Sequence, residues 1–489
     1  MRRIILYDNR FGDNGKVFSD LNPNQIELLK RYGNKSLEEL KSSSCGVIDL
    51  SHSHLDSNDR KQLKFFECHE KDGDCRLDTG NLMGALRFID SETGEAIQVE
   101  VLSRFDDDEN SENKNYFLNY LLSKAFDVSI ANDTVTANQP SLLNLLLDLL
   151  FVRRLDEAMN NGLLRQYKTF RNNDWNFRGR LDLQRHIKEN VPLMNGIAYV
   201  KREIDYDVPV NQLLLLASHI VKKRNPQLFE QNENARDAYR ELLMNVSMPN
   251  DVHKILSHKD CKEPIVHPYY REIWEPLRRL ARMILEEERW QLFQKNSEEE
   301  VFGVVFDGSW LWEEYIATVL APAGFIHCVK GLSSNNNGSL LVFKSGTRKF
   351  YPDFMHKGSD GWNCVLDTKY KYAEYGGVRE DLHQVLCYLL LSGAKLGGLI
   401  FPPLQQGDIE EKKYKGDSNN GGWMTQKEIA SPYSTNENKI YWRCFAWKPI
   451  ENNHRADFES FQQYMKENES ALLLLKNQNM LLSQRRSMD

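Results

Sequence analysis

The sequence predicts an α+β multidomain protein whose parts differ in their hydrophobic pattern. Extended apolar runs dominate the first hundred residues, helical spacing dominates the middle, and strands and helices alternate after residue 296. A chain of 489 residues with 41% hydrophobic residues can bury the cores of two or three domains. We therefore expect a β-rich N-terminal domain (1–145), a helical middle region (146–296), a C-terminal α/β domain (297–450), and a C-terminal helix and tail (451–489).

The N-terminal domain is predicted to contain a β-hairpin followed by helices. Two apolar runs, 82–89 and 96–102, flank the turn-forming Ser91-Glu-Thr-Gly94. Helices are expected at 116–126 and at about 140–159, because Pro140 suits a first helical turn and Asn160-Asn-Gly162 ends a helix.

The middle region combines predicted helices with a basic stretch. The helices cover 211–223, 229–245 and 270–292, the last bent or offset at Pro276. Between residues 151 and 188, nine Lys/Arg stand against four Asp/Glu and alternate with aromatic residues. This mixture suits a phosphate backbone, and it equally suits a solvated helix face over core aromatics. Under the first interpretation the candidate DNA contacts are Arg171, Arg178 and Arg180.

The most informative feature of the C-terminal domain is a pair of aspartates followed by a lysine. Tyr351-Pro-Asp353-Phe precedes Val365-Leu-Asp367-Thr-Lys369-Tyr, with the turn-like Lys357-Gly-Ser-Asp-Gly361 between them. We expect Asp353 to close one strand and a hairpin to return it beside Asp367. Because side chains alternate along a strand, Asp367 and Lys369 share a face. Such a group can hold a hard cation beside an ammonium that orients or helps deprotonate a water molecule.

Two predicted helices flank this hairpin. Gln384 and Tyr388 are four residues apart in the helix that begins near Asp381, so they share one face. Upstream, Trp310-Leu-Trp-Glu313-Glu resembles the amphipathic first helix of a nuclease fold in which an acidic residue commonly completes the metal site. Glu313 is our candidate for that residue, with Glu314 as the alternative.

Each of these residues also has an ordinary structural explanation. Asp353 could cap a turn, and Lys369 could be solvated on an edge strand. Gln384 and Tyr388 could be ordinary residues of the surface and core of a helix. Asp260-Cys-Lys262 and Glu411-Lys-Lys413 match the end of the pattern by chance, because they lack an apolar strand and a partnering Pro-Asp. The joint order of helix, hairpin and helix favours a nuclease site over separate coincidences.

In this order the residues match the PD-(D/E)xK nuclease signature, and the chain resembles the McrC family, the nuclease subunits of modification-dependent McrBC restriction systems. The likeness covers roughly residues 80–400. It rests on Gly84 with its hairpin, the run 149–167, Phe177-Arg178-Gly179-Arg180-Leu, Asn211-Gln-Leu-Leu and the series from Glu313 to Tyr388. The chain departs from the family at Ser103-Arg104-Phe105, where members often carry Pro-Lys.

The resemblance implies a C-terminal PD-(D/E)xK restriction-endonuclease-like domain that cleaves DNA with Mg²⁺, for which Mn²⁺ could substitute. The implied metal ligands are Asp353, Asp367, the Thr368 carbonyl and Glu313. Lys369, Gln384 and Tyr388 complete the catalytic residues. Lys371 is a further candidate DNA contact. The implied partners are modified double-stranded DNA and a hexameric McrB-like AAA+ GTPase, which residues 1–145 would dock onto and stimulate. The chain lacks Gly-x4-Gly-Lys-Ser/Thr, so we expect it to bind no nucleotide itself.

Composition narrows the remaining possibilities. A formal net charge of −7 argues against a protein that coats DNA unaided. No apolar run is long enough to cross a bilayer, and eight cysteines without paired zinc spacing suit a reducing cytoplasm. Two alternatives stay open: a non-cleaving, DNA-binding activator of the GTPase, and a free-standing structure-specific nuclease.

Overall fold

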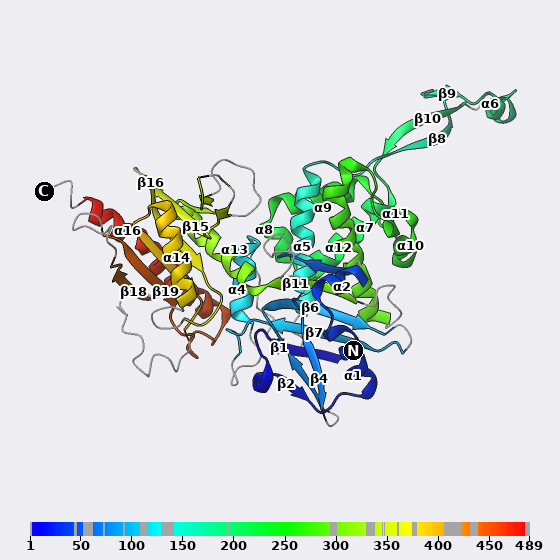
Figure 1. Cartoon of the computed structure of the whole chain (residues 1–489). Coiled ribbons are helices and arrows are strands. Elements are labelled where there is room, and N and C mark those ends of the chain that lie inside the picture. The colour runs from blue at the N-terminus through cyan, green and yellow to red at the C-terminus, as the bar shows by residue number, and fades with distance from the viewer. Residues whose placement is uncertain are drawn as a thin grey trace. The chain divides into compact units, whose positions relative to one another are not determined.

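The structure, a computed structural model drawn in Figure 1, divides into two compact units. One combines Met1–Leu143 with Glu298–Asp489, and the other is Asn144–Ser297. The described residues are 2–43, 46–51, 62–71, 74–90, 93–107, 115–128, 141–192, 196–293, 301–328, 338–344, 346, 348–358, 361–373, 379–404, 422–430 and 439–484. Side-chain surroundings are described for all of these except 289–293, 422–426 and 474–484.

The N-terminal part of the first unit is built on a five-stranded sheet with the order β1-β7-β6-β11-β3. β6 and β7 form the predicted antiparallel hairpin. β1 runs parallel to β7, and β3 runs parallel to β11. The strands are β1 (Arg2–Tyr7), β3 (Gly46–Asp49), β6 (Leu82–Ile89), β7 (Ala96–Leu102) and β11 (Val301–Asp307).

β11 belongs to the N-terminal sheet, although the sequence placed residues from 297 onward in the C-terminal domain. It pairs antiparallel with β6 in the N-terminal sheet, although it follows the middle region in sequence. All of its residues are buried, so its apolar run carried no signal of which sheet it joins. Gly84 permits the pairing: its φ is +126°, and a Cβ there would lie 2.1 Å from the Val304 carbonyl oxygen.

Helices and a second, smaller sheet complete the N-terminal part. The smaller sheet has the order β2-β5-β4. Leu29 and Tyr32 of the first helix share a hydrophobic core with Phe88 of the large sheet. A capping box between Asn22 and Gln25 begins that helix, a signal that our sequence analysis missed. The elements are η1 (Gly12–Asn14), β2 (Lys16–Phe18), α1 (Pro23–Gly33), α2 (Leu37–Ser43), β4 (Glu67–Lys71), β5 (Asp74–Asp78) and α4 (Tyr116–Ala125), the last confirming the helix predicted at 116–126.

The second unit is mainly helical. α12 runs unbroken through Pro276. The helix expected at 229–245 is two helices, because the Asn232 side chain accepts a hydrogen bond from the Ala235 N–H and starts a new one. The helices are α5 (Leu142–Met159), whose first two residues belong to the first unit, α7 (Pro209–Arg224), α8 (Pro226–Gln231), α9 (Glu233–Asn245), α10 (Val252–Ser257), α11 (Lys259–Lys262) and α12 (Pro268–Phe293).

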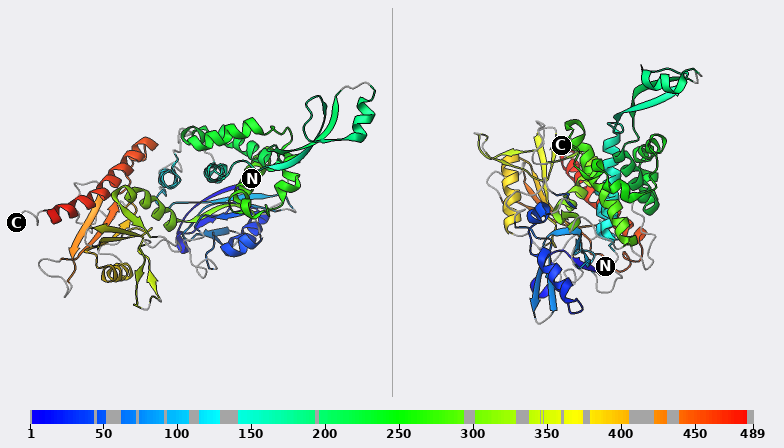
Figure 2. Two further views of the ribbon diagram at one scale, coloured as in Figure 1. Left: turned by 90° about the horizontal axis from the view of Figure 1, so that it is seen from above. Right: turned by 90° about the vertical axis from the view of Figure 1, so that its right-hand side faces the viewer.

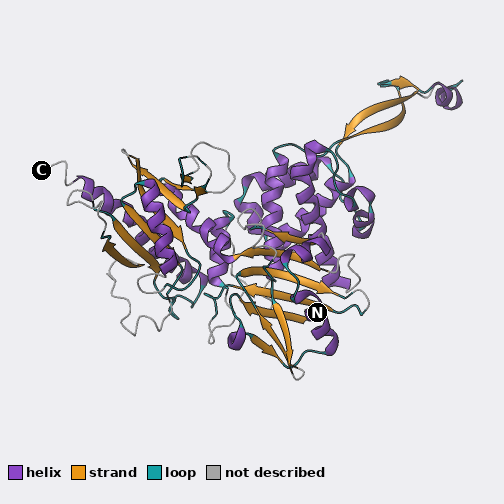
Figure 3. Cartoon of the chain, in the orientation of Figure 1, coloured by secondary structure: helices purple, strands orange, loops and turns teal. Residues whose placement is uncertain are grey.

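An arm, residues 166–205, interrupts the helical middle region that the sequence predicted. It is a three-stranded antiparallel sheet, β8-β10-β9, with one helix, and it extends away from the helices of its own unit (Figures 2 and 3). Gly179 allows the close return of the chain, since its φ is +116° and a Cβ would lie 2.5 Å from the Val200 carbonyl oxygen. The elements are β8 (Gln166–Asp174), β9 (Arg180–Leu181), α6 (Leu183–Asn190) and β10 (Ile197–Asp205).

The C-terminal part of the first unit contains a six-stranded sheet with the order β12-β15-β16-β17-β19-β18. β15 and β16 form an antiparallel hairpin, and β16, β17 and β19 are parallel. The strands are β12 (Phe325–His327), β15 (Phe354–Gly358), β16 (Gly361–Thr368), β17 (Leu396–Phe401), β18 (Gly422–Glu428) and β19 (Tyr441–Trp447); the other elements are α13 (Gly308–Leu320), η2 (Ala321–Ala323), β13 (Leu340–Leu341), β14 (Lys349–Phe350), α14 (Arg379–Ser392) and α16 (Phe458–Gln484).

The polar segment 402–438 contains part of this sheet. β18 lies within it and pairs antiparallel with β19, so β18 forms an edge of the sheet. Residues 405–421 and 431–438 of the insertion lie outside the described residues. Among the helices that the structure describes, none has the length and apolar character needed to span a bilayer.

Candidate active site

The β15–β16 hairpin brings the two predicted aspartates together. Phe354 pairs with Leu366, which puts Asp353 and Asp367 at the same end of the hairpin. Asp353 stands just before β15 and does not close an earlier strand. The structure therefore confirms that the aspartates are neighbours and corrects the strand assignment of the first.

Thr368 fixes the side chain of Asp353. Asp353 Oδ2 accepts hydrogen bonds from the Thr368 N–H at 2.6 Å and from its hydroxyl at 2.7 Å. The Asp353 carbonyl oxygen accepts from the Cys328 N–H at 2.9 Å. Thr368 thus orients a neighbouring carboxylate, a role that the sequence did not indicate, and the role expected for its carbonyl stays a prediction.

Lys369 lies between Asp367 and the helix α14. Its Nζ is 2.7 Å from Asp367 Oδ2 and donates to Gln384 Oε1 at 2.8 Å. Gln384 Nε2 donates in turn to Asp367 Oδ1 at 3.3 Å and to the Tyr388 hydroxyl oxygen at 2.8 Å. The Tyr388 hydroxyl donates to the Tyr351 carbonyl oxygen at 3.3 Å. The predicted helix face therefore contacts the predicted lysine and aspartate directly.

The electrostatics of the cluster favour a bound cation. Burial raises the pKa of Asp353 well above its ordinary value, and the charges of Asp367 and Glu313 raise it further. Burial also raises the pKa of Asp367, against the opposing effect of Lys369. For Lys369, burial alone would lower the pKa, but the charge and hydrogen bond of Asp367 and the charges of Asp353 and Asp381 together outweigh it, and the pKa is raised. Lys369 is therefore an ammonium at neutral pH.

Glu313 of α13 is buried, whereas Glu314 is only partly so. Its Oε1 lies 2.7 Å from His327 Nε2, and the His327 ring stacks on Phe354 at a centroid distance of 5.1 Å. Burial lowers the pKa of His327, but the hydrogen bond and charge of Glu313 reverse the shift and raise it. His327 belongs to a strand of three residues with no motif around it, so no sequence signal marked it.

The donor set of this cluster suits a hard cation such as Mg²⁺, because it consists of carboxylate and backbone oxygens. The mutual effect of the carboxylates on pKa supports this fit, since a divalent cation would offset their repulsion. Within the described part of the chain, however, no three His, Cys, Asp or Glu side chains are already arranged around a common metal position. Asp353 and Asp367 are the residues best placed to hold a cation.

The predicted DNA contacts belong to two different units. Lys371 Nζ lies 2.6 Å from Asp381 Oδ2 beside the cluster. Arg171, Arg178 and Arg180 belong to the arm of the other unit, where all three are exposed.

Comparison with known proteins gives a family and a fold. A family model described as "McrBC 5-methylcytosine restriction system component" matches residues 77–402. The chain is 15% identical, with a TM-score of 0.51, to a chain of the refined half-complex from the tetradecameric assembly of Thermococcus gammatolerans McrB AAA+ hexamers with bound McrC, covering 95% of this chain and 99% of that one. A cryo-EM structure of the Thermococcus gammatolerans McrBC complex matches at 15% identity over 65% and 87% of the two chains, with a TM-score of 0.33. No curated protein matches significantly.

Proposed function

Because the chain belongs to the family of McrBC 5-methylcytosine restriction system components, we propose that it is the DNA-cleaving subunit of a modification-dependent restriction complex. It would hydrolyse a phosphodiester bond of modified double-stranded DNA in the presence of Mg²⁺. A separate McrB-like AAA+ hexamer would hydrolyse GTP and be stimulated by this chain.

One observation carries the proposal: Asp353, Asp367 and Lys369 converge at the end of the β15–β16 hairpin. Lys369 Nζ lies 2.7 Å from Asp367 Oδ2, and the charge of Asp367 raises the pKa of Asp353. Two acids and an ammonium within such reach form the minimal set of a PD-(D/E)xK nuclease. Removing charged side chains from water costs free energy. A cluster of charged groups in a partly buried place is therefore typical of a functional site.

The residues of the cluster have distinct roles in the proposed reaction. Asp353 and Asp367, with the Thr368 carbonyl and Glu313, would hold Mg²⁺ or, as a substitute, Mn²⁺. When bound, the cation supplies a Lewis acid for the phosphate and lowers the pKa of a water molecule. Lys369 keeps its proton and directs positive charge at the phosphate, where negative charge grows in the transition state. Gln384 and Tyr388 hold Lys369 in place through their hydrogen bonds.

The partner would dock on one of two surfaces. The family resemblance assigns this role to residues 1–145. The arm is a second candidate, because eight large apolar side chains are exposed among its described residues; they are Tyr167, Trp175, Phe177, Leu181, Leu183, Ile187, Val191 and Ile204. Exposed apolar residues gathered in one region indicate a surface that another protein covers. The similarity to a chain of an McrB assembly with bound McrC supports a partner of this kind.

A non-cleaving activator is the second candidate function. It is favoured by the lack of a ready three-ligand metal group among the described residues. In that case the acidic cluster would bind no cation, and the chain would only stimulate the GTPase and contact DNA.

A plasmid-cleavage assay separates these functions. The purified chain is incubated with methylated supercoiled DNA and Mg²⁺, with and without an McrB-like AAA+ protein and GTP, beside Asp367→Ala and the exposed control Asp237→Ala. We expect cleavage with the complete mixture, no cleavage by Asp367→Ala, and full activity of the control. GTPase stimulation without cleavage would instead identify an activator, and cleavage without the NTPase a free-standing nuclease.

A further inference from the structure

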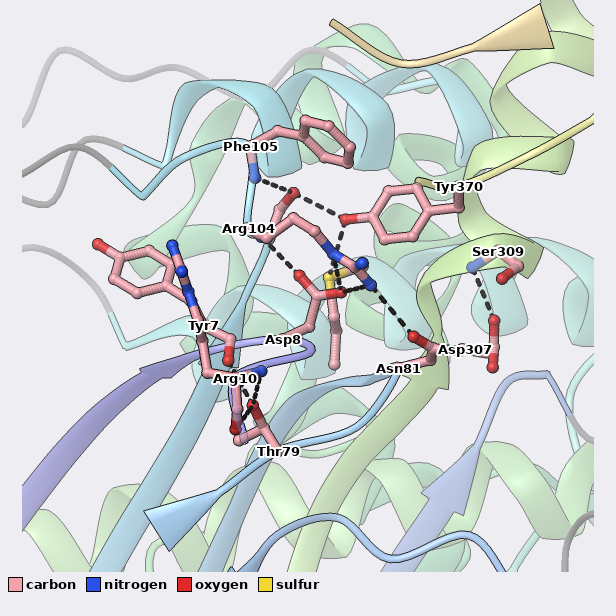
Figure 4. Close-up of polar contacts among 12 residues, drawn as sticks. Tyr7, Asp8, Arg10, Thr79, Asn81, Arg104, Phe105, Asp307, Ser309 and Tyr370 are labelled. Atoms are coloured by element: carbon pink, nitrogen blue, oxygen red, sulfur yellow. Dashed lines mark hydrogen bonds and ion pairs between the residues drawn. The ribbon is translucent and has the colours of Figure 1, made fainter. Parts of the chain in front are cut away.

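The residue after Lys369 joins the candidate active site to the N-terminal part of the same unit. Tyr370 is 7% exposed, and its hydroxyl lies 2.8 Å from Ser103 Oγ, at the end of β7, and 3.6 Å from Met83 Sδ (Figure 4). Its ring lies 5.2 Å from the Arg104 guanidinium and 5.2 Å, centroid to centroid, from the ring of Phe105. The anchor of Tyr370 is therefore Ser103-Arg104-Phe105, the segment where this chain departs from the family pattern.

The anchor is itself held rigidly. Arg104 Nε donates to Asp8 Oδ2 at 2.8 Å, the Arg104 N–H donates to Asp8 Oδ1 at 2.5 Å, and Arg104 Nη2 donates to Asn81 Oδ1 at 3.1 Å. Asp8 is completely buried and Arg104 is 7% exposed. A buried ion pair contributes little net stability, because desolvating both charges offsets their attraction. Its geometric effect is to fix the plane of the guanidinium under the Tyr370 ring.

The same ring packs against the helix that carries Glu313. A Cβ at Gly308, the first residue of α13, would lie 2.5 Å from the Tyr370 ring. The Gly308 N–H donates to the Asn81 carbonyl oxygen at 3.0 Å. Asn81 thus touches both Arg104 and the start of α13. Tyr370 occupies the junction between the end of the hairpin strand, the end of β7 and the helix of Glu313.

From these contacts we infer that Tyr370 is a positioning residue, through which Ser103 and Arg104 of the N-terminal part set the place of Lys369 in the active site. The inference rests on the proposed nuclease function. Consecutive Cα atoms are about 3.8 Å apart, so the backbone of Lys369 follows any shift of Tyr370. The Lys369 N–H donates to the Ile400 carbonyl oxygen at 2.9 Å, and its Nζ is held by Asp367 and Gln384. Tyr370 provides a third constraint on Lys369, beside the backbone hydrogen bond and the contacts of Nζ. Of these three constraints, it alone depends on the N-terminal part.

Through Tyr370, the N-terminal part can change the position of Lys369 and so the rate of cleavage. A shift at the end of β7 would move Tyr370 and, with it, the ammonium that faces the phosphate. Displacements of about 1 Å at a catalytic group can lower a rate by roughly 100-fold without any change in binding. Cleavage would thus depend on the state of the N-terminal part, while the metal ligands remain in place.

The test compares two substitutions that each remove one buried hydroxyl. Tyr370→Phe removes the contact with Ser103, and Ser103→Ala removes it from the other side. The matched control is Tyr464→Phe in α16, since Tyr464 is also buried, at 3% exposed, and its hydroxyl donates to the Lys448 carbonyl oxygen. Each full-length variant is assayed with the GTPase partner for DNA cleavage, for the DNA concentration at half-maximal rate, for stimulated GTP hydrolysis and for thermal stability.

We expect Tyr370→Phe and Ser103→Ala each to lower the cleavage rate at saturating DNA by roughly 10-fold, with the half-saturating DNA concentration and GTP hydrolysis unchanged. The double variant should be no slower than either single variant, because both remove the same contact. Tyr464→Phe should cleave like the wild type.

Two results would overturn the inference while leaving the proposed function intact: wild-type cleavage rates in folded Tyr370→Phe and Ser103→Ala, or an equal loss in Tyr464→Phe. The second would show that activity merely follows stability. Absence of cleavage by the wild-type complex would remove the proposed function, and this inference with it.

Discussion

The candidate active site and the arm differ in how far their functional side chains are exposed to solvent. In the candidate active site the buried Asp367 and the partly buried Lys369 and Gln384 contact one another. On the arm Trp175 is 65% exposed, and Arg178 and Arg180 are exposed as well. Chemistry needs groups that are fixed before the substrate arrives, whereas recognition needs groups that are still available.

Under the proposed function the two regions would share a thermodynamic property: binding of a cation to one, or of a partner to the other, would stabilise it. Burial and the neighbouring charges raise the pKa of Asp353, so a cation would relieve a repulsion that folding creates. The apolar side chains of the arm would leave water when a partner covers them, which contributes about 25 cal/mol per Å². Substitutions in the candidate active site should therefore abolish DNA cleavage, and substitutions on the arm should weaken binding of the partner.

The largest expected effect follows from Asp353→Asn. This change keeps the shape of the side chain but removes a proposed metal-binding charge, so cleavage should fall by about 10³-fold or more, equivalent to about 4 kcal/mol. DNA affinity of the complex, measured by fluorescence anisotropy, should stay within about twofold. A variant that cleaves normally would remove Asp353 from the site.

The next effect distinguishes the two docking candidates. Trp175→Ser removes an exposed aromatic of the arm, and Phe11→Ser removes one that is 61% exposed in the N-terminal part. If the arm docks, Trp175→Ser should raise the concentration needed for half-maximal GTPase stimulation by roughly 30-fold, as for an interface anchor worth about 2 kcal/mol. Phe11→Ser should then change it little, and the reverse result would assign docking to residues 1–145.

A smaller effect is expected from the arm arginines. Replacing Arg171, Arg178 and Arg180 together with Gln should weaken DNA binding by the complex by roughly 10-fold near 0.15 M salt and flatten its salt dependence. The rate at saturating DNA should not change, because the chemistry is elsewhere. Arg153, Arg154 and Arg240, exposed in the same unit but outside the arm, form the control triple. Equal losses in both triples would mean that only net charge matters.

The contrast between the regions also explains what the sequence could predict. Asp353, Asp367 and Lys369 lie within one hairpin, and Gln384 and Tyr388 are one helical turn apart, so local periodicity sufficed to group them. The hairpin 82–89 with 96–102 and the helix 116–126 were predicted for the same reason. Such elements depend on contacts that are short in sequence.

Features that depend on distant contacts or on exposed residues were missed. β11 joins a sheet whose nearest partner strand, β6, is more than 200 residues earlier, and no periodicity encodes that choice. β8 is exposed or half-buried along its whole length, so it lacks the alternation that marks a strand. His327 reaches Glu313 only through tertiary packing, and Tyr370 was counted as an ordinary strand residue.

The smallest effect should come from linkage between Mg²⁺ and protons. The pKa values of Asp353 and Asp367 are raised above their ordinary 3.8, so the folded protein binds these protons more tightly than the unfolded chain does. Without metal, their contribution to stability is present at low pH and is lost as the pH rises through the folded pKa values. Mg²⁺ needs the deprotonated carboxylates, so it should bind more tightly at pH 8 than at pH 6.

Thermal unfolding measures this linkage without any cleavage. At 10 mM Mg²⁺, compared with EDTA, the melting temperature should rise by about 2–4 °C more at pH 8 than at pH 6, as for roughly 1 kcal/mol of additional stabilisation. Asp367→Asn should abolish the difference, because it removes both a titrating group and a ligand, whereas the exposed Asp237→Asn should preserve it. Equal shifts at the two pH values would mean that Mg²⁺ binds elsewhere. The acidic cluster would then have no role in catalysis and, like the arm, could serve only in recognition.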